Sequence, residues 1–220
     1  MDNLLMTVYN RLHAHYGDLN WWPAGSPYEV IVGAILTQNT NWGNVEKAMA
    51  NFGGDITPGR VIAMSPDELK MIIHPAGFFN QKAVYLKAIT EWFACYNFDV
   101  AKVQAKPLDA IRTEILAVRG VGNETADSIL LYAFGFPTFV IDKYTQRFCN
   151  RYPINTGKSY MSVKAYFEAN LPRDAALFNN YHALLVKNAT MHCRAKIYCT
   201  GCPLDIYCQK IAVGGSGNRP

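Results

Sequence analysis

The chain has 220 residues, of which 50% are hydrophobic and 17% are charged. This length allows one or two domains, and the hydrophobic content supplies a core that excludes a wholly disordered protein. The formal net charge of +4 permits a nucleic-acid partner where the basic residues share one face. The longest apolar run, residues 129–141, contains Pro137 and is shorter than the ~20 residues of a membrane helix, so no membrane anchor is expected.

The N-terminus and the cysteines indicate the compartment. Residues 1–16 have neither a basic start nor a small-residue cleavage site, which favours a cytoplasmic protein. Six cysteines in that compartment indicate metal or redox chemistry rather than disulfides. Four of them lie within residues 193–208, whereas Cys95 and Cys149 stand alone and are expected to be small buried residues.

Apolar residues recur at helical spacing between short turn signals, which predicts an all-α fold. The expected helices cover residues 3–16, 28–37, 43–52, 80–96, 108–118, 123–134, 140–152, 159–170 and 174–192. Gly53 and Gly54 end the third of these helices. Another helix begins at Ser65, with Pro66 in its first turn and Glu68 at the capping-box position. The tail at 213–220 is expected to be flexible.

Residues 111–134 resemble two helices joined by the tight turn Gly120-Val121-Gly122. Glycine adopts backbone angles closed to other residues and allows another molecule to approach the main chain. The amides after Gly122 would point outward from a helix N-terminus, where the dipole favours an anion such as a DNA phosphate. We therefore expect the turn through Asn123 to contact the DNA backbone, although an ordinary helix–helix corner has the same pattern.

Four cysteines form a compact cluster near the C-terminus. Cys193, Cys199, Cys202 and Cys208 are separated by five, two and five residues. A zinc ion or a [4Fe–4S] cluster can use four thiolates at such loop spacings.

These features together resemble one known family. Residues 120–151, which include Asp142, are similar to the helix-hairpin-helix and Gly/Pro-Asp signature of the endonuclease III superfamily of DNA glycosylases. Residues 34–40, residues 77–83 and the cysteine cluster extend the resemblance in the expected order. It implies double-stranded DNA containing a damaged base as the partner, and we expect a monomer that is associated with the nucleoid in a prokaryote.

The resemblance also implies two helical lobes that flank a DNA cleft. One lobe is a six-helix barrel over residues 25–136 that ends with the hairpin. The other joins residues 1–24 to residues 137–212 and carries the cluster. The resemblance favours [4Fe–4S] over zinc, although the family has one more residue between the first two cysteines. The cluster is expected to order its loop so that the loop's cations meet the DNA backbone.

One hairpin position separates the classes of this superfamily. Members that also nick the strand carry a lysine nucleophile two residues after the second hairpin glycine, where this chain has Glu124. Glutamate cannot form a Schiff base with the sugar. Lys143 could reach the site but does not occupy the nucleophile's place. We therefore expect a monofunctional glycosylase. A bifunctional oxidised-pyrimidine glycosylase with lyase activity and a non-catalytic binder of damaged DNA are the alternatives.

The substrate is inferred from a missing acid. Adenine-mismatch members carry an acidic residue shortly before the position of Gln38, and residues 32–36 contain none. A neutral base leaves poorly unless it is protonated, whereas a 3-alkylated adenine is already cationic. The sequence does not distinguish among four possible lesions: 3-methyladenine, 7-methylguanine, hypoxanthine and ethenoadenine.

The chain is most similar to the 3-methyladenine DNA glycosylase branch. By resemblance Trp22, Pro23 and Trp42 line the base pocket, with Trp21 and Lys143 as further candidates. A cation over an aromatic ring gains about 0.5–2 kcal/mol. The other interpretation of the tryptophans is that they are core residues.

The expected mechanism begins when the target nucleotide rotates out of the duplex. By resemblance Gln38, with its neighbour Asn39, and Phe78 contact the space that it leaves; Phe78 is either an apolar wedge or a buried aromatic at a helix end. Asp142 then stabilises the positive charge on the sugar and orients water. At about 4 Å and an effective dielectric of about 20 this is worth roughly 4 kcal/mol, or three decades of rate. Asp142 also fits a helix N-cap, and the two roles are compatible. The five histidines are expected at the surface or in packing.

Overall fold

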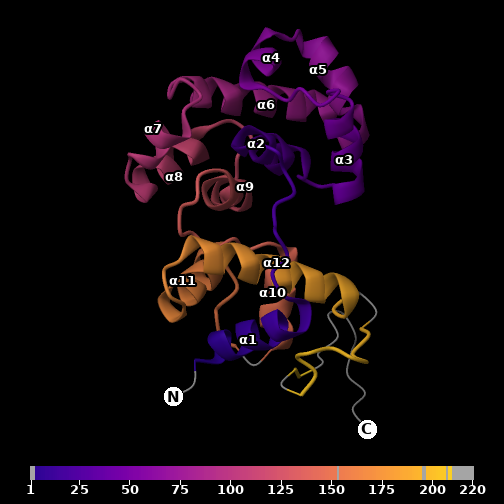
Figure 1. Cartoon of the computed structure of the whole chain (residues 1–220), viewed down its shortest axis with the longest axis vertical. Coiled ribbons are helices and arrows are strands. Elements are labelled where there is room, and N and C mark those ends of the chain that lie inside the picture. Colours follow the sequence, from indigo (N-terminus) through magenta and orange to yellow (C-terminus); the bar gives the residue numbers. More distant parts are fainter. Residues whose placement is uncertain (1–2, 153, 195–196, 207, 210–220) are drawn as a thin grey trace. The chain divides into compact units, whose positions relative to one another are not determined.

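The computed structural model describes residues 3–152, 154–194, 197–206 and 208–209 (Figure 1). All regular secondary structure in these residues is helical, which confirms the all-α class. Contacts divide the chain into two compact units, Trp22–Phe136 and Met1–Trp21 with Pro137–Pro220. We call the first the hairpin unit and the second the cysteine unit. The expected tail at 213–220 lies outside the described residues. None of the described helices has the length and apolar character of a membrane span.

The hairpin unit begins at Trp22 rather than at the expected residue 25, because the Trp22 ring packs against the core of this unit. Its elements are α2 (Pro27–Leu36), α3 (Trp42–Ala50), α4 (Pro58–Ala63), α5 (Pro66–Ile73), the 3-10 turn η1 (His74–Ala76), α6 (Phe79–Ala94), α7 (Val100–Gln104), α8 (Leu108–Ala117), α9 (Asn123–Ser128) and the π-helical turn η2 (Ile129–Ala133).

Helix α2 forms the centre of the hairpin unit. Eight of its ten residues are buried, and it packs against α3, α6, α9 and η2 (Figure 1). Burying one large apolar side chain stabilises a fold by about 1.5–3 kcal/mol, so α2 makes a large contribution. The Ser26 hydroxyl accepts from the Glu29 amide and fixes the start of the helix.

Several predicted helix ends are confirmed. Ser65 and Glu68 form the expected capping box at the start of α5. Gly53 and Gly54 follow α3 with φ values of +69° and +82°, which end the helix. Helices α4 and α7 were not predicted, since six and five residues show too little periodicity. Cys95, expected to be buried, is exposed because it follows the last turn of α6.

The cysteine unit joins both ends of the chain. It contains α1 (Leu4–Tyr16), α10 (Lys143–Arg151), α11 (Tyr160–Asn170) and α12 (Ala175–Met191), and α12 packs against both α1 and α10. Phe139 packs against Phe167 and Phe178 with ring centroids 4.4 and 5.3 Å apart. The Tyr181 hydroxyl donates to the Leu5 carbonyl at 2.8 Å and ties α1 to α12. Cys149 is buried, as predicted.

The helix expected over residues 140–152 is shorter than predicted. Residues 136–142 are not helical, and α10 begins at Lys143. The apolar residues Phe139, Val140 and Ile141 are fully buried in a segment without regular secondary structure, so their burial does not reflect a helix.

Candidate active site

The turn between α8 and α9 needs only one of its two glycines for conformational reasons. Gly120 has a φ of +84°, and a Cβ there would stand 2.2 Å from the Tyr85 ring. Both the backbone and the space therefore require glycine at this position. Gly122 has a φ of −98°, and a Cβ there would meet nothing within 4 Å. The surface beside Gly122 is open to another molecule.

Some groups that were expected to contact DNA are buried or hydrogen-bonded within the hairpin. The Val121 amide donates to the Val118 carbonyl at 3.1 Å, and the Val121 side chain is buried. The Asn123 side-chain oxygen accepts from Arg112 at 2.8 Å. No side chain of the described residues caps α9, which starts at Asn123. The main chain at Gly122 and Asn123 is thus the part of the turn that suits a phosphate.

A buried ion pair holds the two hairpin helices together. Arg112 donates two hydrogen bonds to the Asp127 carboxylate, at 2.9 and 3.0 Å, and the Asp127 side chain is 0% exposed. Bidentate pairs of this kind are strong and fix geometry. The pair was not predicted, although Asp127 stands among the buried residues 125–128, where a carboxylate needs a partner.

The loop after α2 reaches the hairpin through Gln38. Its amide nitrogen donates to the Gly120 carbonyl at 3.0 Å and to the Thr125 hydroxyl at 3.1 Å. Gln38 is therefore bound to the turn from within the hairpin unit. The next residue, Asn39, is exposed and has a left-handed backbone with a φ of +54°.

Phe78 combines exposure with backbone strain. It precedes α6 with a φ of +48°, and its side chain is 60% exposed. A bulky residue with a positive φ is a conformational outlier, and such outliers concentrate at functional sites. The interpretation of Phe78 as a buried helix-end aromatic is wrong.

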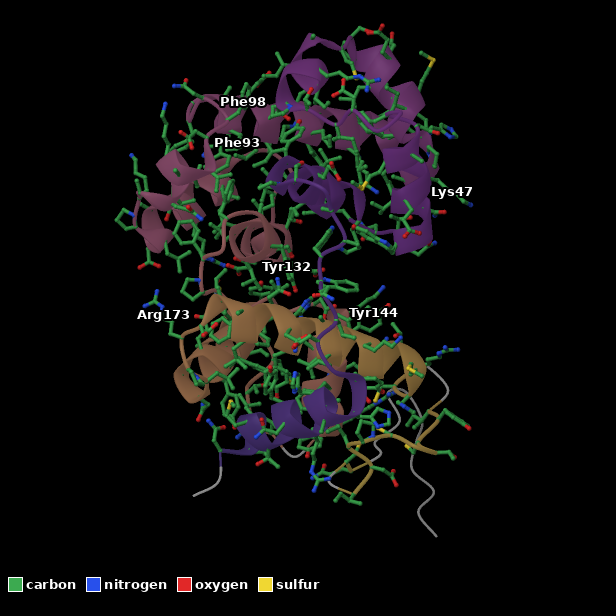
Figure 2. All side chains as sticks on the ribbon, viewed as in Figure 1. Lys47, Phe93, Phe98, Tyr132, Tyr144 and Arg173 are labelled. Carbon is green, nitrogen blue, oxygen red and sulfur yellow. The ribbon has the colours of Figure 1, made fainter. Side chains whose placement is uncertain are left out.

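Three aromatic side chains form a cluster on the hairpin unit. The Trp22 ring lies 5.2 Å from the Trp42 ring, edge to face, and 5.3 Å from the Tyr132 ring. Gly33 makes room for it on α2, since a Cβ there would stand 3.2 Å from the Trp22 indole nitrogen. Tyr132 was not predicted; it belongs to the π-helical turn η2, a feature frequent at functional sites (Figure 2). The three rings, all partly buried, form the aromatic cluster.

The remaining pocket candidates have different surroundings. Trp42 donates its indole N–H to the exposed Glu46 carboxylate at 2.9 Å. Pro23 is exposed beside Trp22. Trp21 and Lys143 fall in the cysteine unit.

Asp142 is the N-cap of α10. One carboxylate oxygen accepts from the Tyr144 and Thr145 amides at 2.9 and 2.7 Å, and the other lies 3.6 Å from Nε2 of His182. Burial opposes ionisation of this carboxyl, but His182 and the Thr145 amide outweigh burial and hold the pKa of Asp142 below its usual value. Asp142 is thus stabilised as a carboxylate that can face developing positive charge.

His182 was expected to be a surface or packing residue, and it is buried beside Asp142. Nothing in its local sequence on α12 marks this position. Lys143 is exposed, and its ammonium lies 5.1 Å from the centroid of the Tyr144 ring.

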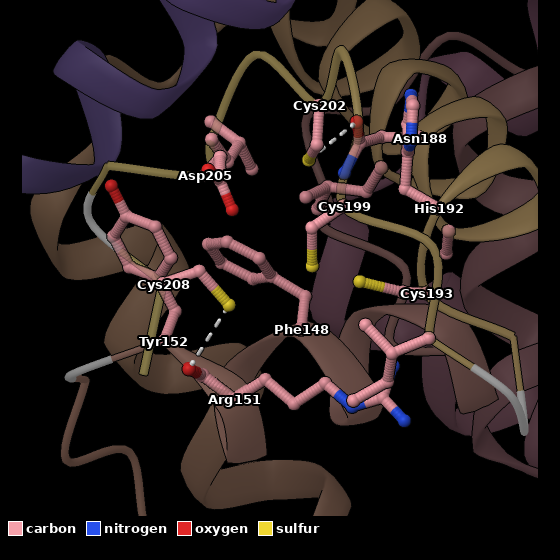
Figure 3. A pocket seen from close by; sticks show the side chains of 14 residues that line it. Phe148, Arg151, Tyr152, Asn188, His192, Cys193, Cys199, Cys202, Asp205 and Cys208 are labelled. Atoms are coloured by element: carbon pink, nitrogen blue, oxygen red, sulfur yellow. Dashed lines mark hydrogen bonds between the residues drawn. The ribbon is translucent and has the colours of Figure 1, made fainter. Parts of the chain in front are cut away.

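The four clustered cysteines line one cavity of the cysteine unit (Figure 3). Phe148, Leu185 and Leu204 supply apolar walls, and Arg151 and Asp205 also line it. Figure 3 shows the sulfurs of Cys193 and Cys199 turned toward each other, while Cys208 donates to the Arg151 carbonyl at 3.5 Å.

The four thiols suit more than one metal group. Among the described residues, no three His, Cys, Asp or Glu side chains converge on one ion position. Tetrahedral zinc binds ligands that converge on a single ion, whereas in a [4Fe–4S] cluster each thiolate holds its own iron. Four thiols around one cavity supply the number of ligands that either group needs.

Comparisons with known proteins identify relatives along nearly the whole chain. A protein of Methanocaldococcus jannaschii, provisionally named a DNA repair glycosylase, is 43% identical over 212 residues, which cover 93% of this chain and 96% of that protein. The thymine/uracil-DNA glycosylase of Pyrobaculum aerophilum is 29% identical over 195 residues, with coverage of 85% and 81%.

Solved structures show the same fold. A trapped endonuclease III–DNA covalent intermediate has a TM-score of 0.79 at 22% identity and covers 96% of this chain and 97% of its own. The Helicobacter pylori 3-methyladenine DNA glycosylase bound to 1,N6-ethenoadenine has a TM-score of 0.72 at 23% identity, with coverage of 85% and 97%. Residues 32–173 match the HhH-GPD superfamily of base excision DNA repair proteins. The chain therefore belongs to this superfamily and is a DNA glycosylase of the endonuclease III type of fold.

Proposed function

We propose that the chain is a monofunctional glycosylase that flips alkylated purines such as 3-methyladenine out of duplex DNA and hydrolyses their glycosidic bond. The aromatic cluster carries this proposal. The carboxylate of Glu46, bound to the indole N–H of Trp42, increases the electron density of that ring. A cationic base stacked on such a ring gains about 0.5–2 kcal/mol that a neutral base does not.

The catalytic group is the Asp142 carboxylate. The hairpin unit supplies the DNA-binding and stacking groups, and the cysteine unit supplies this charge. Residues 32–36 are apolar and buried within α2, so they offer no acid that could protonate a departing base. One carboxylate at about 4 Å is worth roughly 4 kcal/mol, which suits a base whose bond alkylation has already weakened.

The residue at the nucleophile's position and the placement of Lys143 support a monofunctional enzyme. Glu124, at the second position of α9, is exposed and stands where a strand-nicking relative would carry its lysine. The Lys143 ammonium lies over the neighbouring Tyr144 ring. A carboxylate cannot form a Schiff base, so the expected product is an intact abasic strand.

The DNA contacts follow from the exposed main chain and the strained loops. The amides of Gly122 and Asn123 would bind a phosphate, and Phe78 would enter the base stack as an apolar wedge. Gln38 fixes the hairpin turn, and Asn39 would contact the strand beside the wedge. We further propose that the enzyme acts as a monomer on DNA in the cytoplasm.

The four cysteines are proposed to hold a [4Fe–4S] cluster. When bound, the cluster supplies four metal–thiolate bonds that order the C-terminal loop. Iron and sulfide analysis of anaerobically purified protein tests this assignment. Four irons per chain with a broad visible absorbance support it, whereas colourless protein with one zinc per chain contradicts it.

A second candidate is a monofunctional glycosylase for thymine or uracil. The similarity to the Pyrobaculum aerophilum enzyme of that name favours it. A pyrimidine can leave as an anion that hydrogen-bond donors stabilise, so it also needs no protonating acid.

Base release from a panel of duplexes tests both candidates. The panel contains methylated DNA as a source of 3-methyladenine and 7-methylguanine, and oligonucleotides with hypoxanthine, ethenoadenine, uracil, mismatched thymine or thymine glycol. Release of methylated purines with breaks that appear only after alkali supports the first proposal. Preferred release of uracil or thymine supports the second. Direct nicks and borohydride trapping contradict both, and binding without release indicates a non-catalytic protein.

A further inference from the structure

A buried ammonium lies beneath the strained Phe78 turn. The Lys82 side chain is 2% exposed, and its Nζ donates to the main-chain carbonyls of Leu36 and Ala76, both at 2.8 Å. Burial lowers the pKa of Lys82 to about 8. A buried cation is unfavourable unless hydrogen bonds compensate for its lost hydration, so these two bonds hold the side chain firmly in place.

The two carbonyls belong to separate segments of the hairpin unit. Leu36 is the last residue of α2, and Ala76 is the last residue of η1. Carbonyls at helix ends lack intrahelical partners and carry partial negative charge, which suits an ammonium. Lys82 therefore fastens the end of α2 to the end of η1.

Each fastened segment precedes a residue with a left-handed backbone by two or three positions. Asn39 stands three residues after Leu36 and has a φ of +54°, and Phe78 stands two residues after Ala76 and has a φ of +48°. Both side chains are exposed. The Lys82 amide also donates to the Phe78 carbonyl at 3.0 Å. Lys82 therefore contacts the Phe78 turn, residues 76–78, through both its main chain and its side chain.

We propose that Lys82 is a positioning residue for base flipping: its ammonium locks the Asn39 loop and the Phe78 turn to each other, so that both enter the DNA together. This inference rests on the proposed function, in which Phe78 is the wedge. Lys82 itself is buried and contacts no substrate. It acts by keeping two strained segments in the conformation that flipping requires.

The same helix provides a matched control. Lys87, also on α6, donates to the main-chain carbonyls of Ile62 and Met64 at 2.7 and 2.5 Å. Like Lys82 it donates through Nζ to two main-chain carbonyls, but it is half-buried, and both carbonyls lie at the C-terminal end of α4 rather than beside the Phe78 turn. Lys87→Met thus removes two ammonium–carbonyl hydrogen bonds from the same helix without releasing Phe78.

A double-mutant cycle between Lys82→Met and Phe78→Ala tests the proposal. The measured quantity is an affinity ratio: the affinity for a duplex with a tetrahydrofuran abasic-site analogue divided by the affinity for the undamaged duplex. It is measured at a temperature where circular dichroism shows that each variant is folded. Fluorescence of 2-aminopurine placed beside the analogue reports unstacking. Lys82→Arg, which keeps the charge but displaces both loops, replaces Lys82→Met in the cycle should the methionine variant not fold.

We expect Lys82→Met to lower the affinity ratio about tenfold, which corresponds to about 1.4 kcal/mol. In the Phe78→Ala background the further loss is expected to be below about twofold, because Lys82 acts through the wedge. Lys87→Met should leave the ratio within about twofold of wild type.

Three results overturn the inference. An unchanged ratio in folded Lys82→Met, additive losses in the cycle, or an equal loss in Lys87→Met would each show that Lys82 only stabilises the fold. A different result would show that Phe78 is not a wedge: Phe78→Ala alone would then leave the affinity ratio unchanged. That result removes the role of Lys82 as well.

Discussion

Replacing Asp142 with asparagine separates the two roles that this side chain has in the structure. The side-chain oxygen of asparagine can accept the same two amide hydrogens, from Tyr144 and Thr145, that Asp142 accepts at 2.9 and 2.7 Å. Asparagine and aspartate are about equally good N-caps. The variant therefore retains the helix start and loses the charge that lies 3.6 Å from His182.

Asp142→Asn should lower the excision rate far more than it lowers the stability of the fold. A carboxylate about 4 Å from the sugar contributes roughly 4 kcal/mol at an effective dielectric of about 20, so Asp142→Asn should lower the excision rate about a thousandfold. Its free energy of unfolding should change by about 1 kcal/mol or less, since the charge contributes about 0.3–1 kcal/mol to the helix dipole interaction. Asp142→Ala also removes the cap and should destabilise the fold by a further 0.5–2 kcal/mol or so.

The assay is single-turnover release of a methylated purine, scored after alkali, with urea unfolding of both variants. Asp142→Asn is expected to bind lesion DNA as well as wild type and to release almost no base. An Asp142→Asn enzyme that retains more than about a tenth of wild-type activity would refute the catalytic assignment. Equal destabilisation by asparagine and alanine would refute the capping argument, because only alanine lacks the acceptor.

Four further substitutions test neighbouring residues of the candidate site. His182→Gln should raise the pKa of Asp142, because His182 holds that pKa down. A carboxyl group with a lowered pKa stabilises the fold above that pKa, and this stability is lost as the pH falls through it. The acidic fall in excision rate and the acid unfolding transition should therefore both move to higher pH. Gly120→Ala should destabilise the protein by more than about 2 kcal/mol from its positive φ and its clash, whereas Gly122→Ala should keep stability within about 0.5 kcal/mol and weaken DNA binding. Glu46→Gln should slow release of cationic 7-methylguanine while leaving hypoxanthine release unchanged, and equal slowing of both would contradict the cation–π argument.

Features with a local cause could be predicted from the sequence. The capping box at Ser65 and the stop at Gly53 and Gly54 depend on residues within one turn, and both are found. The buried non-helical segment before α10 could not be told from a helix, because three consecutive apolar residues, Phe139, Val140 and Ile141, fit the spacing of a helix and that of a strand equally well.

The surroundings of a candidate site residue could be predicted where the side chain's chemistry shows in the local sequence pattern. Asp142 follows an apolar run at a helix start, so its position and cap were readable. Tyr132, His182 and Lys82 were not, because each gains its meaning from a partner far along the chain: the Trp22 ring, the Asp142 carboxylate and the Leu36 carbonyl. Helical periodicity gives the face on which a residue lies but not the residue it meets there.

Two phenylalanines with nearly the same backbone conformation differ in how their side chains pack, and this difference supports the proposed role of Phe78 as a wedge. Phe98 has a φ of +57° and Phe78 a φ of +48°. The Phe98 ring packs edge to face on Phe93 at 5.7 Å (Figure 2), so packing offsets its unfavourable conformation. Phe78 makes no comparable ring contact among the described residues and is 60% exposed. Strain of about 1–3 kcal/mol that no packing of the Phe78 ring offsets supports our proposal that a bound partner uses this side chain, and an unstacked base step in DNA is a partner that an exposed aromatic ring can enter.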